Sequence, residues 1–148
     1  MTLVRPLIAT LLALTAVGCT SEEEPKLKYQ PTLTWLMANV FNPSPATLTS
    51  CTYSNCHSSV NPSNGVDLTD PAKIIALKGK QAGQGFDGRS DWLVIDPGKP
   101  ENSSLYRYLQ GNAKGDGAQE EIMPPGAKLN AAQLAAVKEW ILRGAKND

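Results

Sequence analysis

The chain has 148 residues with 14 basic and 14 acidic side chains, so its formal charge at pH 7 is zero. This balance gives no argument for binding to nucleic acid or to an anionic membrane surface. The length allows one small domain, and with only two Phe and three Trp residues its core would be thin if built from protein alone.

Residues 1–18 are typical of a signal peptide. Arg5 supplies a positive charge near the start, and the apolar run at 7–17 is too short to span a bilayer as a stable helix. We therefore expect this segment to be removed, and its loss leaves 13 basic and 14 acidic groups.

The apolar run ends in small residues directly before a cysteine, Ala16-Val17-Gly18-Cys19. This pattern resembles the lipobox of bacterial lipoproteins, in which the cysteine is diacylated and becomes the first residue. We predict a lipid anchor at Cys19 in the bacterial cell envelope, with the domain in the periplasm or at the cell surface. Thr20 rather than aspartate follows Cys19, which favours the outer over the inner membrane. An ordinary signal peptide with Cys19 as a stray thiol is the alternative.

The rest of the chain divides into a short polar tether at 19–31 and one domain at 32–148. The domain opens with a predicted helix at 32–41, whose apolar residues recur at i, i+3, i+4, i+7 and i+8. A second, short helix should begin with Asp70 as its cap and Pro71 at its first position, and it should end at Gly79.

Two more helices are predicted after a buried extended piece at 92–95. The third should be capped by Asn102 or Ser103, should end before Gly111, and should bury one face made of Leu105, Tyr106 and Leu109. The fourth should run over 131–143, where Asn130 is the cap, Gly144 is the stop, and the apolar stripe consists of Leu134, Val137, Trp140 and Ile141.

The only histidine of the chain lies in a seven-residue motif, Cys51-Thr52-Tyr53-Ser54-Asn55-Cys56-His57. Two cysteines followed by a histidine are typical of a c-type haem attachment site, where both sulfurs form thioether bonds and the histidine is an axial iron ligand. The commoner spacing has two residues between the cysteines, so the four residues here must bulge outward. We expect one or two helical turns over the motif.

Other chemistry fits the motif less well. A disulfide between Cys51 and Cys56 is feasible in an oxidising compartment and stays open as an alternative. Structural zinc needs four protein ligands, and apart from Cys19, which is assigned to the lipid, the chain has no Cys or His beyond the three in this motif. A catalytic Cys/His pair lacks an orienting third group, and exported thiols this close would tend to oxidise.

A second axial ligand must come from a residue other than histidine, because His57 has no counterpart in the chain. Met37 lies on the apolar face of the first helix, where core packing explains it. Met123 lies in a long polar loop and is followed by Pro124 and Pro125, which restrict the backbone around it. Met123 is therefore the candidate ligand, and the alternative is an iron that is five-coordinate or binds water.

Five motifs in this order resemble a small cytochrome c-like domain family found in exported proteins of myxobacteria and planctomycetes. They are C-x4-C-H at 51–57, Gly-Val-Asp-Leu at 65–68, Asp-Pro-Gly-Lys-Pro-Glu-Asn-Ser-Ser-Leu-Tyr-Arg at 96–107, Met-Pro-Pro-Gly at 123–126, and a C-terminal stretch from Leu129-Asn130 to Trp140-Ile141-Leu142-Arg143-Gly144-Ala145. The resemblance covers about 33–145. The proline-rich run before Cys51 is longer than the family pattern.

The resemblance implies an all-α fold, a small helical domain with long loops wrapped around one haem. It also implies that Cys51 and Cys56 hold one haem c covalently, that His57 is the proximal ligand and that Met123 is the distal ligand. The predicted function is that of a lipid-anchored, monomeric electron carrier with a redox partner protein and no enzymatic activity. The alternative is a haem-free exported lipoprotein module with a Cys51–Cys56 disulfide and a structural or interaction role.

Overall fold

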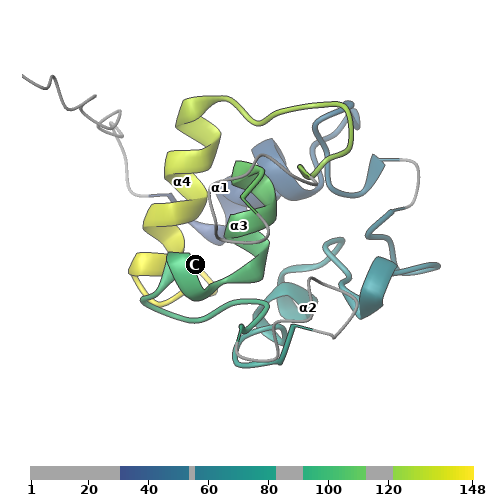
Figure 1. Cartoon of the computed structure of the whole chain (residues 1–148). Helices are drawn as coiled ribbons and strands as arrows, with labels where there is room; N and C mark the ends of the chain where they lie inside the picture. Colours follow the sequence, from purple (N-terminus) through teal and green to yellow (C-terminus); the bar gives the residue numbers. More distant parts are fainter. Residues whose placement is uncertain (1–30, 54–55, 83–91, 113–121) are drawn as a thin grey trace, which may run out of the picture.

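The computed structural model describes residues 31–53, 56–82, 92–112 and 122–148 (Figure 1). The predicted signal peptide and the lipidation site at Cys19 lie outside these residues, as does nearly all of the tether. Within the described ranges, no helix is both long enough and apolar enough to cross a membrane.

The first and last helices of the described residues pack against each other and contribute to one core. Helix α1 (Leu33–Leu36) continues directly into the π-helical turn η1 (Met37–Phe41), and α4 (Ala131–Leu142) lies against α1. Phe41 and Trp140 are both almost fully buried and meet edge to face, with ring centroids 6.3 Å apart. Figure 1 shows α1, α3 and α4 gathered in one half of the molecule, with α2 below them.

The segment predicted as one helix at 32–41 is helical throughout, but its winding changes after Leu36. Thr32 caps α1, and its side chain accepts a hydrogen bond from the Trp35 backbone N–H at 3.1 Å. In η1 the Asn42 N–H donates to the Met37 carbonyl, a wider turn than that of an α-helix. Apolar spacing does not distinguish these two windings over so short a run.

Helix α4 begins and ends as the sequence predicts, within one residue. Asn130 and Gln133 form a capping box, in which each side chain accepts from the backbone N–H of the other at 2.9 and 3.0 Å. Gly144 follows the helix with φ of 92°, a conformation that favours glycine. The predicted stripe faces the core, with Leu134 partly buried and the other three residues fully buried.

Helix α2 (Pro71–Ile75) begins as predicted, because the Asp70 side chain accepts from the Ala72 N–H at 2.7 Å. It ends at Ile75, earlier than the stop predicted at Gly79. The backbone leaves the helix because Lys78 forms an isolated bridge with Ile95, and the Gly79 N–H then donates to the Ile95 carbonyl.

Helix α3 (Ser104–Gln110) follows the short 3₁₀ turn η4 (Pro100–Asn102) and ends at Gly111, whose φ is 72°. Ser103 occupies the cap position, but its side chain does not cap the helix. The hydroxyl instead accepts from the Asp96 N–H at 2.9 Å and donates to the Lys99 carbonyl at 3.0 Å. The predicted capping bond is therefore wrong, and Ser103 holds the preceding turn together.

The remaining described segments are loops joined by single β-bridges rather than by extended strands. The apolar piece at 92–95 packs as predicted, with Trp92, Val94 and Ile95 buried, but the chain bends at Val94. Leu93 forms bridges with both Gln81 and Ser103, so this piece connects the α2 region to the start of α3. The short 3₁₀ turn η3 (Ser63–Gly65) carries the chain back beneath the cysteine motif.

Candidate cofactor site

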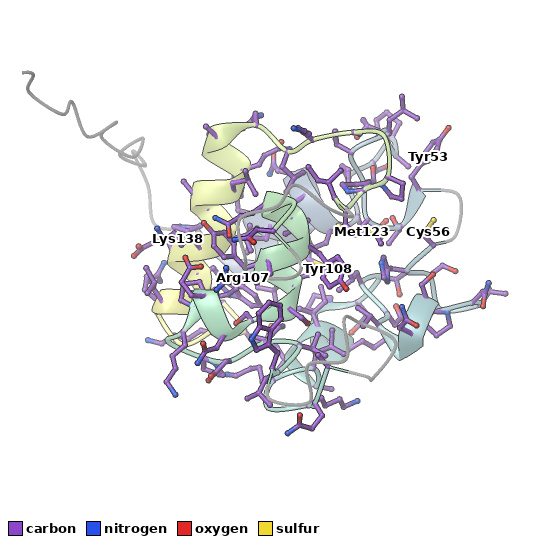
Figure 2. The ribbon with its side chains drawn as sticks, viewed as in Figure 1. Tyr53, Cys56, Arg107, Tyr108, Met123 and Lys138 are labelled. Atoms are coloured by element: carbon purple, nitrogen blue, oxygen red, sulfur yellow. The ribbon has the colours of Figure 1, made fainter. Side chains whose placement is uncertain are left out.

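One cavity of about 430 Å³ brings together all four residues predicted to hold a haem, namely Cys51, Cys56, His57 and Met123. Its walls come from the cysteine motif, from 63–68, from one face of α3 and from 123–125. Figure 2 shows Tyr108 and Met123 near the middle of the view and Cys56 across from them. Residues far apart in sequence therefore converge on a single hollow.

The cavity is apolar, and its size is typical of a small-molecule or cofactor site. Among the described residues, its lining includes no Lys, Arg, Asp or Glu side chain. The polar groups that face it are hydroxyls, one amide and the His57 ring. Such a wall suits a flat hydrophobic ligand held by a few specific bonds.

His57 is held in a defined orientation by the segment that follows η3. The Nδ1 atom of its ring lies 3.0 Å from the Val66 carbonyl oxygen, and the Leu68 N–H donates to the His57 carbonyl at 3.0 Å. A carbonyl oxygen can only accept, so in the neutral ring this contact places the proton on Nδ1 and leaves the lone pair on Nε2. The ring is thus prepared to bind a metal through Nε2.

The two cysteines lie in different environments, and both are free thiols in the structure. Cys51 is buried with the core residues, and its Sγ–H donates to the Val40 carbonyl at 3.7 Å. Burial raises the pKa of the Cys51 thiol to about 12, so the group is protonated at neutral pH. A thiol of this kind is a poor nucleophile, which argues against a catalytic Cys51/His57 pair. Cys56 is exposed.

The helical turns predicted over the motif are 3₁₀-like where its residues are described, and Tyr53 lies in such a turn. The Tyr53 N–H donates to the Ser50 carbonyl, and the Cys56 N–H donates to the Tyr53 carbonyl, both at 3.2 Å. These bonds span three residues and form tight turns rather than an α-helix. Tight turns shorten the path between the cysteines, so both can line one cavity despite their wide spacing.

The structure separates the two methionines as the sequence predicts. Met37 is partly buried in η1 and packs against the core, whereas Met123 lines the cavity. The Met123 N–H donates to the Tyr108 carbonyl at 3.0 Å, and the adjacent Pro124 is buried. The end of α3 therefore anchors the loop that carries Met123.

Sequence analysis missed the role of α3 as a wall of the cavity. The predicted buried face of Leu105, Tyr106 and Leu109 does pack with the core, but Leu105 and Leu109 also line the cavity together with Tyr108. The spacing of Leu105, Tyr108 and Leu109 at i, i+3 and i+4 is the signal that could have identified this face.

Protein-family models, curated protein sequences and solved structures all give no match to this chain. The chemistry of the cavity must therefore be judged from its side chains. Two thiols, one imidazole with a free Nε2 and one thioether lie on a single apolar surface. This donor set fits a covalently attached haem with one nitrogen and one sulfur ligand.

Proposed function

We propose that this chain is a monohaem c-type cytochrome whose small all-α, cytochrome c-like domain transfers single electrons. The observation that carries the proposal is the convergence of Cys51, Cys56, His57 and Met123 on one apolar cavity. These residues come from two separate parts of the sequence, so a fold unrelated to cofactor binding would have no reason to bring them together.

Each of the four residues has a separate role in this proposal. Cys51 and Cys56 form the thioether bonds, His57 binds the iron through Nε2, and Met123 supplies the second axial ligand through its sulfur. The bound haem would provide an Fe(II)/Fe(III) couple for one-electron transfer. Ligation by His and Met raises the reduction potential relative to two histidines, so the carrier would act toward the oxidising end of an electron-transfer chain.

The surrounding residues keep the site dry and in place. Val66, Leu68 and Leu109 are buried apolar residues of the cavity wall, and they exclude water from the face of the macrocycle. Exclusion of water favours the less charged ferrous state and raises the potential further. A dry, rigid site also reduces the rearrangement that accompanies each electron transfer.

We propose a carrier rather than an enzyme, because the thiols and the imidazole at the cavity are assigned to holding the haem, and its described lining offers the hydroxyls no carboxylate or second imidazole as a base. A haem-free module with a Cys51–Cys56 disulfide is the competing function. The separate environments of the two free thiols do not favour that pairing.

The site does not determine where the protein is located, and that part of the proposal rests on the N-terminal sequence. Lipidation at Cys19 would attach the carrier to the outer membrane. The domain would then meet its redox partner protein as a monomer, in the periplasm or at the cell surface.

The test is a redox titration of protein produced with a working c-type maturation system, followed by visible spectroscopy. We expect sharp bands of a low-spin haem in the reduced protein and a reversible one-electron transition. His57→Ala should retain the attached chromophore but lose the low-spin spectrum. Wild-type protein without visible absorption would refute the proposal.

A further inference from the structure

A network of polar side chains lies directly behind the bond that orients His57. Val66 accepts from the His57 ring and Leu68 donates to the His57 backbone, so the segment 66–68 contacts His57 twice. Val66 and Leu68 are both buried, which fixes this segment from the core side. Asp67 lies between them in sequence. Its side chain accepts hydrogen bonds from Thr69 and Lys73.

The Asp67 carboxylate has three hydrogen-bond donors. Its Oδ1 accepts from the backbone N–H and the hydroxyl of Thr69 at 3.0 and 2.6 Å, and its Oδ2 accepts from Lys73 Nζ at 2.7 Å. Lys73 also donates to Ser59 Oγ at 2.9 Å, and Ser59 Oγ lies 2.8 Å from Thr69 Oγ1. We call these four residues the Asp67 network.

The Asp67 network joins three parts of the chain that surround His57. Ser59 follows His57 by two residues, Asp67 adjoins Val66, and Lys73 lies in α2. Hydrogen bonds from Lys73 and Thr69 hold the pKa of Asp67 well below its usual range, so the carboxylate is charged under ordinary conditions. The network therefore fastens the Val66 carbonyl to the body of the domain.

We propose that Asp67 is a positioning residue for the axial ligand: with Lys73 it holds the Val66 carbonyl against Nδ1 of His57 and so tunes the haem iron. The inference rests on the proposed function. A firm hydrogen bond to Nδ1 makes the imidazole more basic, and a more basic imidazole stabilises Fe(III). Loosening the network should weaken that bond and raise the reduction potential.

The test compares Asp67→Ala with Lys73→Met, because these two changes have opposite effects on charge. If the charges alone acted on the iron, loss of the carboxylate would raise the potential and loss of the ammonium would lower it. If the network acts by position, both variants raise the potential. Lys73→Arg keeps a cation and its donors, so it should remain near the wild-type value.

A matched control removes a carboxylate from a surface ion pair elsewhere. The carboxylate of Glu101 in η4 lies 3.7 Å from the guanidinium of Arg107 in α3, and neither residue belongs to the Asp67 network or to the segment that contacts His57. Glu101→Ala should leave the potential unchanged. A second measurement follows the Nδ1 proton of His57 by NMR in the ferrous protein, where exchange with solvent should be faster in Asp67→Ala and in Lys73→Met than in wild type.

The outcomes distinguish this inference from the proposed function. A wild-type protein without haem would refute both the proposed function and this inference. A haem-loaded, redox-active wild type whose potential and proton exchange do not change in Asp67→Ala and Lys73→Met would overturn the inference and leave the cytochrome proposal intact. Shifts of opposite sign in the two variants would show an effect of charge alone and would also overturn it.

Discussion

The Nδ1 atom of His57 lies 3.0 Å from the carbonyl oxygen of Val66, nine residues further along the chain. This one contact defines which ring nitrogen is free and connects the cysteine motif to the segment that passes beneath it. The wall of the cavity and the orientation of its only imidazole are therefore produced by the same loop. A site built in this way should respond to changes in the loop as well as to changes in the ligands.

Met123 should be the residue that closes the sixth position of the iron. Met123→Ala should lose the weak far-red band of sulfur-to-iron ligation, bind cyanide or carbon monoxide readily, and shift to a lower potential, because a thioether favours Fe(II). Visible spectroscopy and ligand titration of the loaded protein measure all three effects.

Met37 provides the matched control, since it is the other methionine of the domain and packs against the core. Met37→Ala should lower the free energy of unfolding by about 1–2 kcal/mol, less than a fully buried methionine would cost, and should retain the spectrum. Loss of the far-red band in Met37→Ala but not in Met123→Ala would show that the ligand is assigned wrongly.

Asp67 should make part of the stability dependent on pH. The bonds from Lys73 and Thr69 lower its folded-state pKa, so the contribution is present above the unfolded carboxyl pKa of about 3.9 and disappears as the pH falls toward the folded value. Asp67→Asn should be less stable than wild type at about pH 6, and the gap should narrow progressively as the pH falls below about 4.

Urea unfolding of both proteins across this pH range measures the gap in the free energy of unfolding. The gap at neutral pH should be modest, because Lys73 is half exposed and water screens the pair. A gap that stays constant with pH would mean that the ionised carboxylate does not contribute.

Trp140 should dominate the stability of the core. Its ring is almost fully buried against Phe41, and its Nε1–H donates to the Lys146 carbonyl at 2.9 Å. Trp140→Ala should reduce the free energy of unfolding by about 3–5 kcal/mol. Leu142 is 47% exposed in the same helix, and Leu142→Ala should cost less than about 1 kcal/mol. Equal losses in chemical denaturation would contradict this placement of α4.

Local chemistry made much of the helical structure predictable from sequence. Asp70 and Asn130 accept backbone hydrogen bonds at the starts of their helices, and Gly111 takes the positive φ that ends α3. Each of these signals acts within a few residues, so no knowledge of the tertiary fold is needed. The candidate ligands were also identified from sequence, because the chain offers one histidine and few sulfur atoms.

Features that depend on distant contacts were not predictable. Ser103 resembles a helix cap in sequence, but the turn at 96–99 engages its hydroxyl instead. The spacing of Tyr108 with Leu105 and Leu109 indicates a shared helix face, but only the packing of α3 shows that this face lines a cavity. The bond from His57 to Val66 depends on how the chain returns after η3, which no local pattern determines.

The lipid anchor should depend on Cys19. Cys19→Ser should release the protein into the soluble fraction or leave the signal peptide uncleaved, because the proposed anchor requires an acyl chain on this sulfur. Fractionation of cells that express each form, followed by immunoblotting, measures the difference. Unchanged membrane association in a processed Cys19→Ser protein would contradict lipidation at this residue.

Covalent attachment of one haem through Cys51 and Cys56 is the central claim, and mass spectrometry of the denatured protein tests it most directly. Protein made with a c-type maturation system should carry the added mass of one haem, and proteolysis should place that mass on the peptide containing 51–57. The double variant Cys51→Ser, Cys56→Ser should lack the added mass of the haem. A wild-type peptide whose mass shows only a disulfide between the two cysteines would contradict the account.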